Sequence, residues 1–350
     1  MKEKFNIKKL VRSNVAKLQP YSSARDDFKS NGKEMVFLDA NENPFENGLN
    51  RYPDPQQNKL KSAVAKIKNV DKNQILLGNG SDEVLDLIFR AFCEPHQDNI
   101  ITLPPTYGMY TVLAGINAIE NRQVLLSKTF ELRENHILEK ADEHSKILFI
   151  CSPNNPTGNL FDKEKITFLL NNFQGLVVID EAYADFSSEE SWVNFLNSHS
   201  NLIVTQTLSK AFGMAGIRLG MCFTSPEIVT ILNKIKPPYN VNQLTQEKAL
   251  TRIENHQNVE REISIILKER QFLTEELKNV TFIEKIYPSD SNFALVKVDN
   301  ATKRYEELLQ HGIVVRNRTD QALCENTLRF TVGTESENRK LMEALKMMRS

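Results

Sequence analysis

The chain has 350 residues, enough for two or three domains of ordinary size. Apolar residues make up 40% of the sequence and charged residues 25%, the balance of a globular protein with a sizeable core. The 44 Lys and Arg residues nearly cancel the 45 Asp and Glu residues. This balance argues against a strongly basic nucleic-acid binder and against an acidic disordered chain.

The four cysteines and six histidines are scattered and show neither metal-site spacing nor the pattern of a disulfide framework. We therefore expect no bound metal and a reducing cytoplasmic compartment. The N-terminus lacks the apolar centre of a signal peptide, and no apolar run approaches the roughly 18 residues of a membrane span. The sequence thus predicts a cytoplasmic protein that binds neither membrane nor nucleic acid.

Strand and helix patterns alternate along the first two thirds of the chain, after a polar N-terminal arm. Helical spacing of apolar residues predicts helices over 60–70, 82–93, 106–118 and 163–173 and beyond residue 226. Short apolar runs predict strands over 74–78, 99–103, 145–153, 175–183 and 201–210. Apolar strands separated by helices of ten or more residues favour a mostly parallel, doubly wound sheet.

The pattern changes after Pro237 and Pro238. Residues 259–279 predict a long charged helix that could bridge two domains, and strands over 292–298 and 328–333 flank a helix over 304–312. The C-terminal part is therefore expected to form a smaller α+β unit beside the larger α/β domain.

The segment TLSKAFGMAGIRLG, residues 207–220, carries the strongest chemical signal. Lys210 follows an apolar strand, with the hydroxyls of Thr207 and Ser209 just before it and Arg218 eight residues later. Lysine forms a Schiff base with an aldehyde, and hydroxyls beside an arginine can hold a phosphate. An isolated Ser-Lys pair is usually an exposed loop, so the spacing of the neighbouring residues is what favours a functional site.

Two further segments follow apolar strands. Asp180 ends the strand of GLVVIDEAY, at the edge where ligands of open α/β sheets bind. A carboxylate there can pair with a cationic ring nitrogen, although a helix N-cap is an equally simple role. Asn155 lies in CSPNNPTG, a turn by composition whose amide could also contact a ligand oxygen.

The segment GNGSDE, residues 78–83, lies between a strand and a helix. Amides at such a helix N-terminus bind phosphate, and Ser81 or Asp82 could instead serve as a simple N-cap. Glu83 occupies the third glycine position of a dinucleotide fingerprint, which argues against a dinucleotide. Tyr107 in PPTYGMY could stack on a planar ligand, or it could be a packed core residue.

Together these motifs resemble the fold type I aminotransferases that use pyridoxal 5′-phosphate. They occur in the family order LDANENPF, RYPDP, GNGSDE, PTYGMY, SPNNPTG, VVIDEAY, TLSKAFGMAGIRLG and LRFTVGT. Within that group LDANENP, RYPDP, PTYGMY, GIVVR and LRFTVGT are most similar to the histidinol-phosphate aminotransferase family, and PYSSAR is similar to one of its branches. The resemblance implies an aspartate-aminotransferase-like large domain at 46–245, a small domain of 31–45 and 246–350, and an N-terminal arm at 1–30.

The resemblance also implies catalytic roles. Lys210 would bind the cofactor aldehyde and then act as base and acid in the proton shift. Asp180 would keep the pyridine nitrogen protonated. Asn155 and Tyr183 would hydrogen-bond the cofactor's phenolic oxygen, and Tyr107 would stack on its ring.

Other residues would bind phosphate and substrate by the same resemblance. The cofactor phosphate would be held by Thr207, Ser209 and Arg218, by the amides of Ser81 and Asp82, and by Tyr52 of a neighbouring subunit, which implies a homodimer with shared active sites. The substrate would be bound by Tyr21, Asn155, Arg316 and Arg329. Arg318 lies on the same face as Arg316 if the segment is extended, but a solvated surface role is the simpler interpretation for it.

The expected activity is amino-group transfer between glutamate and imidazole acetol phosphate in histidine biosynthesis. An aromatic amino-acid aminotransferase and a threonine-phosphate decarboxylase of the same fold are alternatives. A transcription regulator that has adopted this fold is the alternative outside enzymes. It is disfavoured because the family motifs already begin by residue 38, which leaves no room for a preceding DNA-binding module, and because the net charge is near zero.

Overall fold

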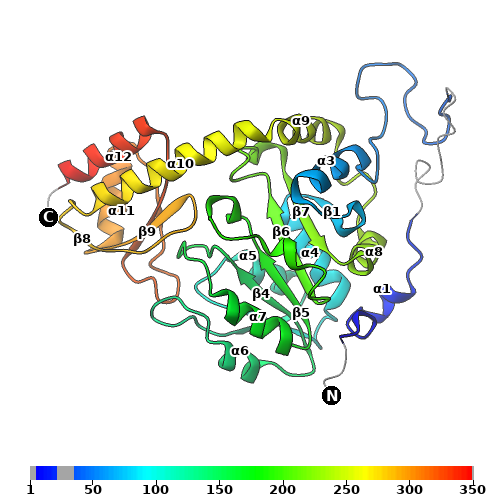
Figure 1. Cartoon of the computed structure of the whole chain (residues 1–350), viewed down its shortest axis with the longest axis horizontal. Coiled ribbons are helices and arrows are strands. Elements are labelled where there is room, and N and C mark those ends of the chain that lie inside the picture. The colour runs from blue at the N-terminus through cyan, green and yellow to red at the C-terminus, as the bar shows by residue number, and fades with distance from the viewer. Residues whose placement is uncertain (1–4, 22–34, 349–350) are drawn as a thin grey trace.

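Two β-sheets organise the chain into a larger and a smaller body (Figure 1). The computed structural model describes residues 5–21 and 35–348. The larger sheet has seven strands in the order β1-β7-β6-β5-β4-β2-β3, and the smaller has four in the order β10-β11-β9-β8. The expected fold, a mostly parallel α/β domain with a smaller α+β unit, is confirmed.

The seven strands of the larger sheet are short and their central members are apolar. They are β1 (Ile75–Asn79), β2 (Asn99–Thr102), β3 (Glu120–Gln123), β4 (Ser145–Cys151), β5 (Leu176–Asp180), β6 (Leu202–Thr207) and β7 (Leu219–Thr224). Strands β3, β2, β4, β5 and β6 pair in parallel, whereas β7 runs antiparallel to both β6 and β1. The carboxyl ends of β4, β5 and β6 therefore meet at one edge.

Helices cover both faces of this sheet, because successive side chains of a strand point to opposite faces. Phe149 of β4 joins the core on one face, while Leu148 and Ile150 join the core on the other. The first core includes side chains of α4 (Ser81–Phe92), α5 (Met109–Ile116) and α8 (Pro226–Ile235). The second includes side chains of α3 (Asn58–Lys68), α6 (Glu134–Lys140), α7 (Lys163–Asn172) and α9 (Gln243–Glu254). No helix of the described residues has both the length and the apolar character needed to cross a membrane.

The smaller body has its own core. Its strands are β8 (Ile283–Ile286), β9 (Phe293–Val298), β10 (Arg316–Asn317) and β11 (Thr327–Thr331), and all of its strand pairs are antiparallel. Helices α11 (Ala301–Gln310) and α12 (Glu335–Met347) complete it. Many of its buried side chains, such as Leu328 and Phe330, form a third cluster, whereas Phe293 and Leu295 of β9 belong to a core of the larger body.

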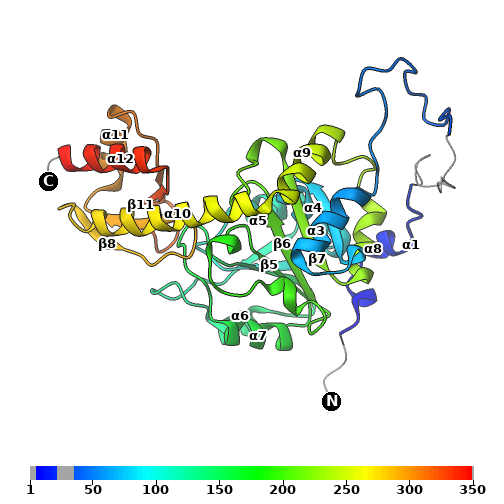
Figure 2. The same cartoon turned by 45° about the horizontal axis from the view of Figure 1, so that its top comes forward.

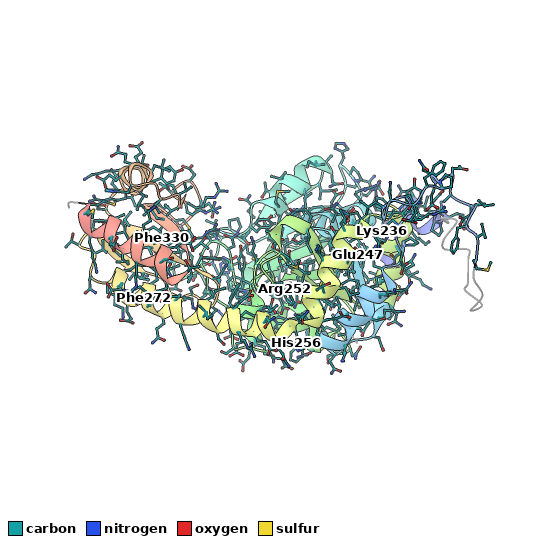
Figure 3. All side chains as sticks on the ribbon, turned by 90° about the horizontal axis from the view of Figure 1, so that it is seen from above. Lys236, Glu247, Arg252, His256, Phe272 and Phe330 are labelled. Atoms are coloured by element: carbon teal, nitrogen blue, oxygen red, sulfur yellow. The ribbon has the colours of Figure 1, made fainter. Side chains whose placement is uncertain are left out.

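One long helix, α10 (His256–Leu277), connects the two bodies (Figure 3). Its start contributes Val259 to the core of the larger body, and its end contributes Leu273 and Leu277 to the core of the smaller one. Arg252, in α9, fixes the start of α10, because its guanidinium donates to the carbonyl of Phe212 at 2.9 Å and pairs with Glu262. The two ends of α10 thus belong to different hydrophobic cores. The division of the chain into a large and a small domain at residue 245 stays a prediction.

Residues 35–53 form an extended segment that contains no helix or strand. It lies beside α3 and α8, at the far end of the molecule from the small sheet (Figures 1 and 2). Glu42 ties its two halves together by accepting hydrogen bonds from the Arg51 guanidinium and the Tyr52 amide, both at 2.7 Å. Residues 31–34 lie outside the described residues, so the assignment of 31–45 to the small domain also stays a prediction.

Candidate active site

A cavity of about 190 Å³ lies at the carboxyl ends of β4, β5 and β6. Ten of the side chains expected from the sequence line it: Ser81, Asp82, Tyr107, Asn155, Asp180, Tyr183, Thr207, Ser209, Lys210 and Arg218. Cys151 and Ala182 complete the lining. Because parallel strands end at the same edge of a sheet, segments as far apart in the sequence as Ser81 and Arg218 meet in this cavity.

Asp180 is the most deeply buried charged group of the cavity. It ends β5 between Cys151 of β4 and Thr205 of β6. Its carboxylate accepts hydrogen bonds from the hydroxyl of Tyr110 at 2.7 Å and from the Ala182 amide at 3.1 Å. Burial raises the pKa of Asp180, and the hydrogen bond from Tyr110 is the largest opposing effect.

Tyr110 is a residue of the site that the sequence motifs do not indicate. Its ring is fully buried and stacks on Phe149 at 4.7 Å between centroids. A buried aromatic residue on a helix gives the same pattern as any core residue, so only its position three residues after Tyr107 could have suggested a role. The structure shows that its hydroxyl bonds Asp180 and that its ring meets the ring of Tyr107 edge-on, at 5.6 Å between centroids.

Lys210 lies just after β6 and lines the cavity. Its Nζ is 5.6 Å from the ring centroid of Tyr183. Partial removal from water lowers the pKa of this amine, and the positive charge of Arg329 lowers it further, while Asp180 acts in the opposite direction. A larger fraction of the amine is therefore uncharged at neutral pH than for a lysine in water, as a nucleophile or base requires.

The loop before α4 and the strand β7 approach each other so closely that side chains are excluded. A Cβ at Gly220 would collide with the backbone nitrogen of Ser81. At Gly80, where φ is +78°, a Cβ would lie 2.8 Å from the guanidinium of Arg218. This packing brings Arg218 to the N-terminus of the twelve-residue helix α4, where free amides and the helix dipole favour an anion.

The hydroxyls of Thr207 and Ser209 lie next to this N-terminus. They are 3.1 Å apart, and the Thr207 hydroxyl also accepts from the Ser209 amide at 3.1 Å. Arg218 lies 3.9 Å from Asp82, whose other oxygen accepts a hydrogen bond from Tyr107 at 3.1 Å. Hydroxyls, helix amides and a guanidinium together make a suitable set of donors for a phosphate group.

Arg329 of β11, in the small sheet, reaches the cavity through its contact with Asn155, which lines it. Its guanidinium donates a hydrogen bond to the side-chain oxygen of Asn155 and lies over the ring of Phe293, 4.9 Å from the centroid. Tyr183 meets the same ring edge-on at 5.1 Å. Burial and the positive charge of the neighbouring Arg318 lower the pKa of Arg329 to about 10. The largest effect in the opposite direction comes from the Tyr183 phenol.

Besides Arg329, three expected site residues do not line the cavity in this chain. Tyr52 is half exposed and stacks on Tyr239 at 4.5 Å. Tyr21 is 75% exposed and precedes the segment 22–34, which lies outside the described residues. Arg316 pairs with Arg329 in the register of β10 and β11 but is exposed.

Glu83 explains why the loop before α4 differs from a dinucleotide-binding turn. Its carboxylate accepts hydrogen bonds from the Asn79 amide and from the Asn240 side chain, the latter at 2.8 Å. It therefore anchors the loop rather than contacting a ligand. Among the residues that the structure describes, no group of three or more His, Cys, Asp or Glu side chains is arranged to hold a metal.

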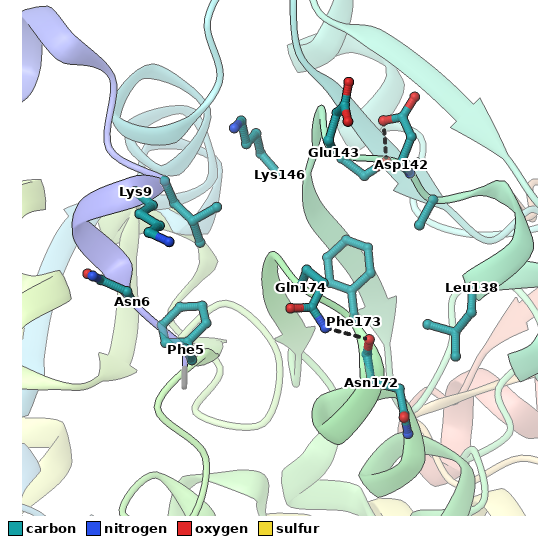
Figure 4. A pocket seen from close by; sticks show the side chains of 13 residues that line it. Phe5, Asn6, Lys9, Leu138, Asp142, Glu143, Lys146, Asn172, Phe173 and Gln174 are labelled. Atoms are coloured by element: carbon teal, nitrogen blue, oxygen red, sulfur yellow. Dashed lines mark hydrogen bonds between the residues drawn. The ribbon is translucent and has the colours of Figure 1, made fainter. Parts of the chain in front are cut away.

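A second hollow, of about 640 Å³, lies at the opposite end of β4 (Figure 4). Its lining includes two basic side chains, Lys9 and Lys146, and two acidic ones, Asp142 and Glu143. Because the seven residues of β4 span about 20 Å, this hollow is separated from Lys210 by the length of the sheet. It takes no part in the chemistry of the first cavity.

A family model and two relatives match nearly the whole chain. The family described as aminotransferase class I and II matches residues 34–345. A histidinol-phosphate aminotransferase from Christiangramia forsetii is 61% identical over 342 residues, which cover 98% of each chain. Another from Flavobacterium johnsoniae is 59% identical over 345 residues, 98% of this chain and 99% of that protein. The chain belongs to the histidinol-phosphate aminotransferase family.

The aminotransferase also matches a solved structure. The histidinol-phosphate aminotransferase of Clostridium acetobutylicum superimposes with a TM-score of 0.79 at 28% identity, over 85% of this chain and 90% of the other. The architecture of the aminotransferase, with its seven-stranded sheet and smaller α+β unit, is therefore shared with a family member of much lower identity.

Proposed function

We propose that this aminotransferase uses pyridoxal 5′-phosphate to move an amino group from glutamate to imidazole acetol phosphate, or in reverse from histidinol phosphate to 2-oxoglutarate, as a step of histidine biosynthesis. One observation carries the proposal. The amine of Lys210 shares one cavity with the buried carboxylate of Asp180 and the anion-binding N-terminus of α4, and Arg329 reaches its rim. An amine, a buried acid and two separate sets of anion-binding groups match a phosphorylated aldehyde and an anionic substrate.

The residues of the cavity fit this cofactor. Lys210 would hold its aldehyde carbon, Asp180 its ring nitrogen, Asn155 and Tyr183 its phenolic oxygen, and Tyr107 the face of its ring. The phosphate would lie against Ser81, Asp82, Thr207, Ser209 and Arg218, where a Cβ at Gly80 or Gly220 would fill the space. When bound, pyridoxal phosphate supplies an electron sink for the substrate carbon that loses its proton.

Lys210 then moves the proton. Its Nζ has a lowered pKa because of burial and of Arg329. Once the substrate amine has displaced it from the cofactor's aldehyde carbon, it would take the proton from the substrate carbon and deliver it to that former aldehyde carbon. Asp180 would stabilise positive charge on the ring nitrogen, and the hydrogen bond from the Tyr110 hydroxyl favours the ionised form of this buried carboxylate. Tyr183, buried beside Phe293, helps to exclude water from the reacting carbon.

Arg329 would bind the anionic end of the substrate. Its guanidinium points to Asn155, and a planar guanidinium bonds either a carboxylate or a phosphate bidentately. Arg316, on the neighbouring strand, and Tyr21 would complete the phosphate-binding groups when the N-terminal arm folds over the site. The substrate anion would replace Asn155 as a partner of Arg329.

A homodimer in the cytoplasm completes the proposal. Val36, Leu38 and Phe45 are 82%, 89% and 80% exposed, and a second copy would remove these apolar side chains from water. Tyr52, close to them in the chain and half exposed, would then reach the cofactor phosphate of the neighbouring subunit. Light scattering should give twice the chain mass, and Tyr52→Ala should weaken cofactor binding. A monomer that retains full activity would contradict this part of the proposal.

Half-reactions test the function itself. The purified protein should be yellow, and borohydride should fix the cofactor on Lys210. Glutamate and histidinol phosphate should each convert the cofactor to its amine form, as followed by absorbance. Conversion by glutamate and aromatic amino acids but not by histidinol phosphate would indicate the aromatic enzyme instead. Release of carbon dioxide from threonine phosphate would indicate the decarboxylase.

A further inference from the structure

Three arginines share one face of the β10–β11 ribbon. Arg316 lies opposite Arg329 in the register, and the pairing continues because the Arg318 amide donates to the carbonyl of Thr327 at 2.9 Å. Residues two apart in a strand point to the same face. Arg318 and Arg329 are thus diagonal neighbours, with Cβ atoms about 7 Å apart, a distance that long side chains bridge.

Arg318 is not a solvated surface residue. Its side chain is half-buried, whereas Arg316 is exposed. Burial lowers the pKa of Arg318 and the charge of Arg316 lowers it further. The groups that raise the pKa of Arg318 are the Tyr183 phenol and the Cys324 thiol. No carboxylate of the described residues is among the groups that shift this pKa.

Buried polar atoms without partners gather around this pair. Among the described residues, the Nε atoms of both Arg318 and Arg329 are buried and form no hydrogen bond, and so are the side-chain oxygens of Thr319 and Gln321. Leaving such atoms unpaired is costly. Two uncompensated guanidiniums with unpaired donors are the arrangement expected around a bound anion.

The two arginines differ in their distance from the reacting centre. Arg329 contacts Asn155, and its charge has the largest electrostatic effect on the pKa of Lys210, whereas Arg318 is not among the charges with the largest effects on that amine. Arg329 is therefore the inner arginine and Arg318 the outer one. A carboxylate has one charge and two oxygens, which one guanidinium fork satisfies, but a phosphate ester has a second charge and a third oxygen.

We propose that Arg318 determines specificity for a phosphorylated substrate by binding the phosphate group on the side away from Arg329. This inference rests on the proposed function. It assigns to Arg318 a contact with the substrate phosphate, whereas the glutamate carboxylate that binds Arg329 does not need this contact. Arg318 thereby distinguishes the two substrates that the same cavity must accept in turn.

The test compares the two half-reactions in the holoenzyme of the wild type, Arg318→Gln and Arg318→Lys. Losing a hydrogen-bonded charge should raise the apparent dissociation constant of histidinol phosphate about 10- to 100-fold. That of glutamate should change less than about 5-fold. Arg318→Lys should recover part of the affinity, because lysine keeps the charge but not the fork. Arg261→Gln is the matched control, because Arg261 is an exposed arginine of α10 outside the cavity and outside the β10–β11 ribbon.

Inorganic phosphate separates this inference from the proposed function. If wild-type enzyme does not react with histidinol phosphate, the proposed function fails, and phosphate is then titrated as a competitor of glutamate. A weaker inhibition constant in Arg318→Gln than in wild type would still support Arg318 as a phosphate ligand. Equal inhibition constants, or equal losses for glutamate and histidinol phosphate, would overturn it. Unchanged cofactor absorbance and unfolding midpoint establish that the variants are folded.

Discussion

The hydroxyl of Tyr110 donates a hydrogen bond to the carboxylate of Asp180, 2.7 Å away, and both side chains are buried. Tyr110 comes from α5, on one face of the sheet, and Asp180 ends β5 at the edge of the cavity. Burial alone would favour the protonated acid, which cannot pair with a cationic nitrogen. The hydrogen bond from Tyr110 therefore opposes the protonation of Asp180 that burial favours.

Tyr110→Phe tests this relationship. Removing the donor should raise the pKa of Asp180 further, so the acidic limb of the pH profile of kcat/KM should move to higher pH. At neutral pH we expect a loss of about 10-fold, the effect of one hydrogen bond to a charged group. Tyr107→Phe removes a hydroxyl that bonds Asp82 instead and should leave the acidic limb in place. A uniform loss without a pH shift would show that Tyr110 serves only packing.

Arg329 and Lys210 are coupled by charge. Because the guanidinium lowers the pKa of the Lys210 amine, Arg329→Gln should raise it. The uncharged amine is the form that attacks an aldehyde, so the rate at which the apoprotein incorporates pyridoxal phosphate should reach its plateau at higher pH than in wild type. Arg316→Gln should change this profile less, since Arg316 is not among the charges with the largest effects on Lys210. The same profile for all three proteins would contradict the coupling.

The contact between β7 and the loop before α4 leaves no room at Gly220. Gly220→Ala would push a methyl group into the Ser81 amide and the Gly80 carbonyl, at a cost of about 1–3 kcal/mol in the free energy of unfolding. Cofactor affinity should fall as well, because the same displacement moves the N-terminus of α4. Gly216→Ala is the control, since a Cβ there meets no atom within 4 Å. Urea unfolding and cofactor titration measure the two effects.

Arg304 anchors α11 to the small sheet. Its fully buried guanidinium bonds Asp299 at 2.6 and 2.9 Å and lies 4.0 Å from the ring centroid of Phe282. Arg304→Met keeps much of the packing but loses the charged hydrogen bonds, so the free energy of unfolding should fall by about 2 kcal/mol. Lys303→Ala breaks only an exposed pair at 4.0 Å and should cost less than about 0.5 kcal/mol.

Both variants should bind cofactor as wild type does, because Arg304 and Lys303 lie outside the cavity. A loss of cofactor affinity in Arg304→Met would instead mean that the small body controls the cofactor site directly.

The sequence predicted the parts of the fold whose signal is local. Strands β4, β5 and β6 are apolar throughout because both of their faces are covered, and α10 has a long amphipathic pattern. Strand β3 has the sequence ENRQ at the sheet edge, and nothing in such a polar run indicates a strand. The antiparallel direction of β7 follows from the short connection after β6, since a parallel partner needs a longer crossover.

The residues of the candidate site also fall into those that the sequence predicts and those that it does not. Lys210 lies just after an apolar strand and Asp180 ends another. The strand pattern alone therefore predicts their position at the edge of the sheet. Tyr110 and Arg318 are not predictable in this way, because their significance depends on which atoms face them across the fold. Tyr110 has the pattern of a core residue, and Arg318 gains its surroundings only when β10 pairs with β11.

Helix α10 is shared by two hydrophobic cores, and this has a mechanical consequence. The first part of α10 is held to the larger body by Arg252, which bonds Glu262 and the Phe212 carbonyl. Phe212 is two residues from Lys210. Because α10 is one continuous helix, a displacement of the small sheet that moved this helix would be transmitted to the loop that carries Lys210.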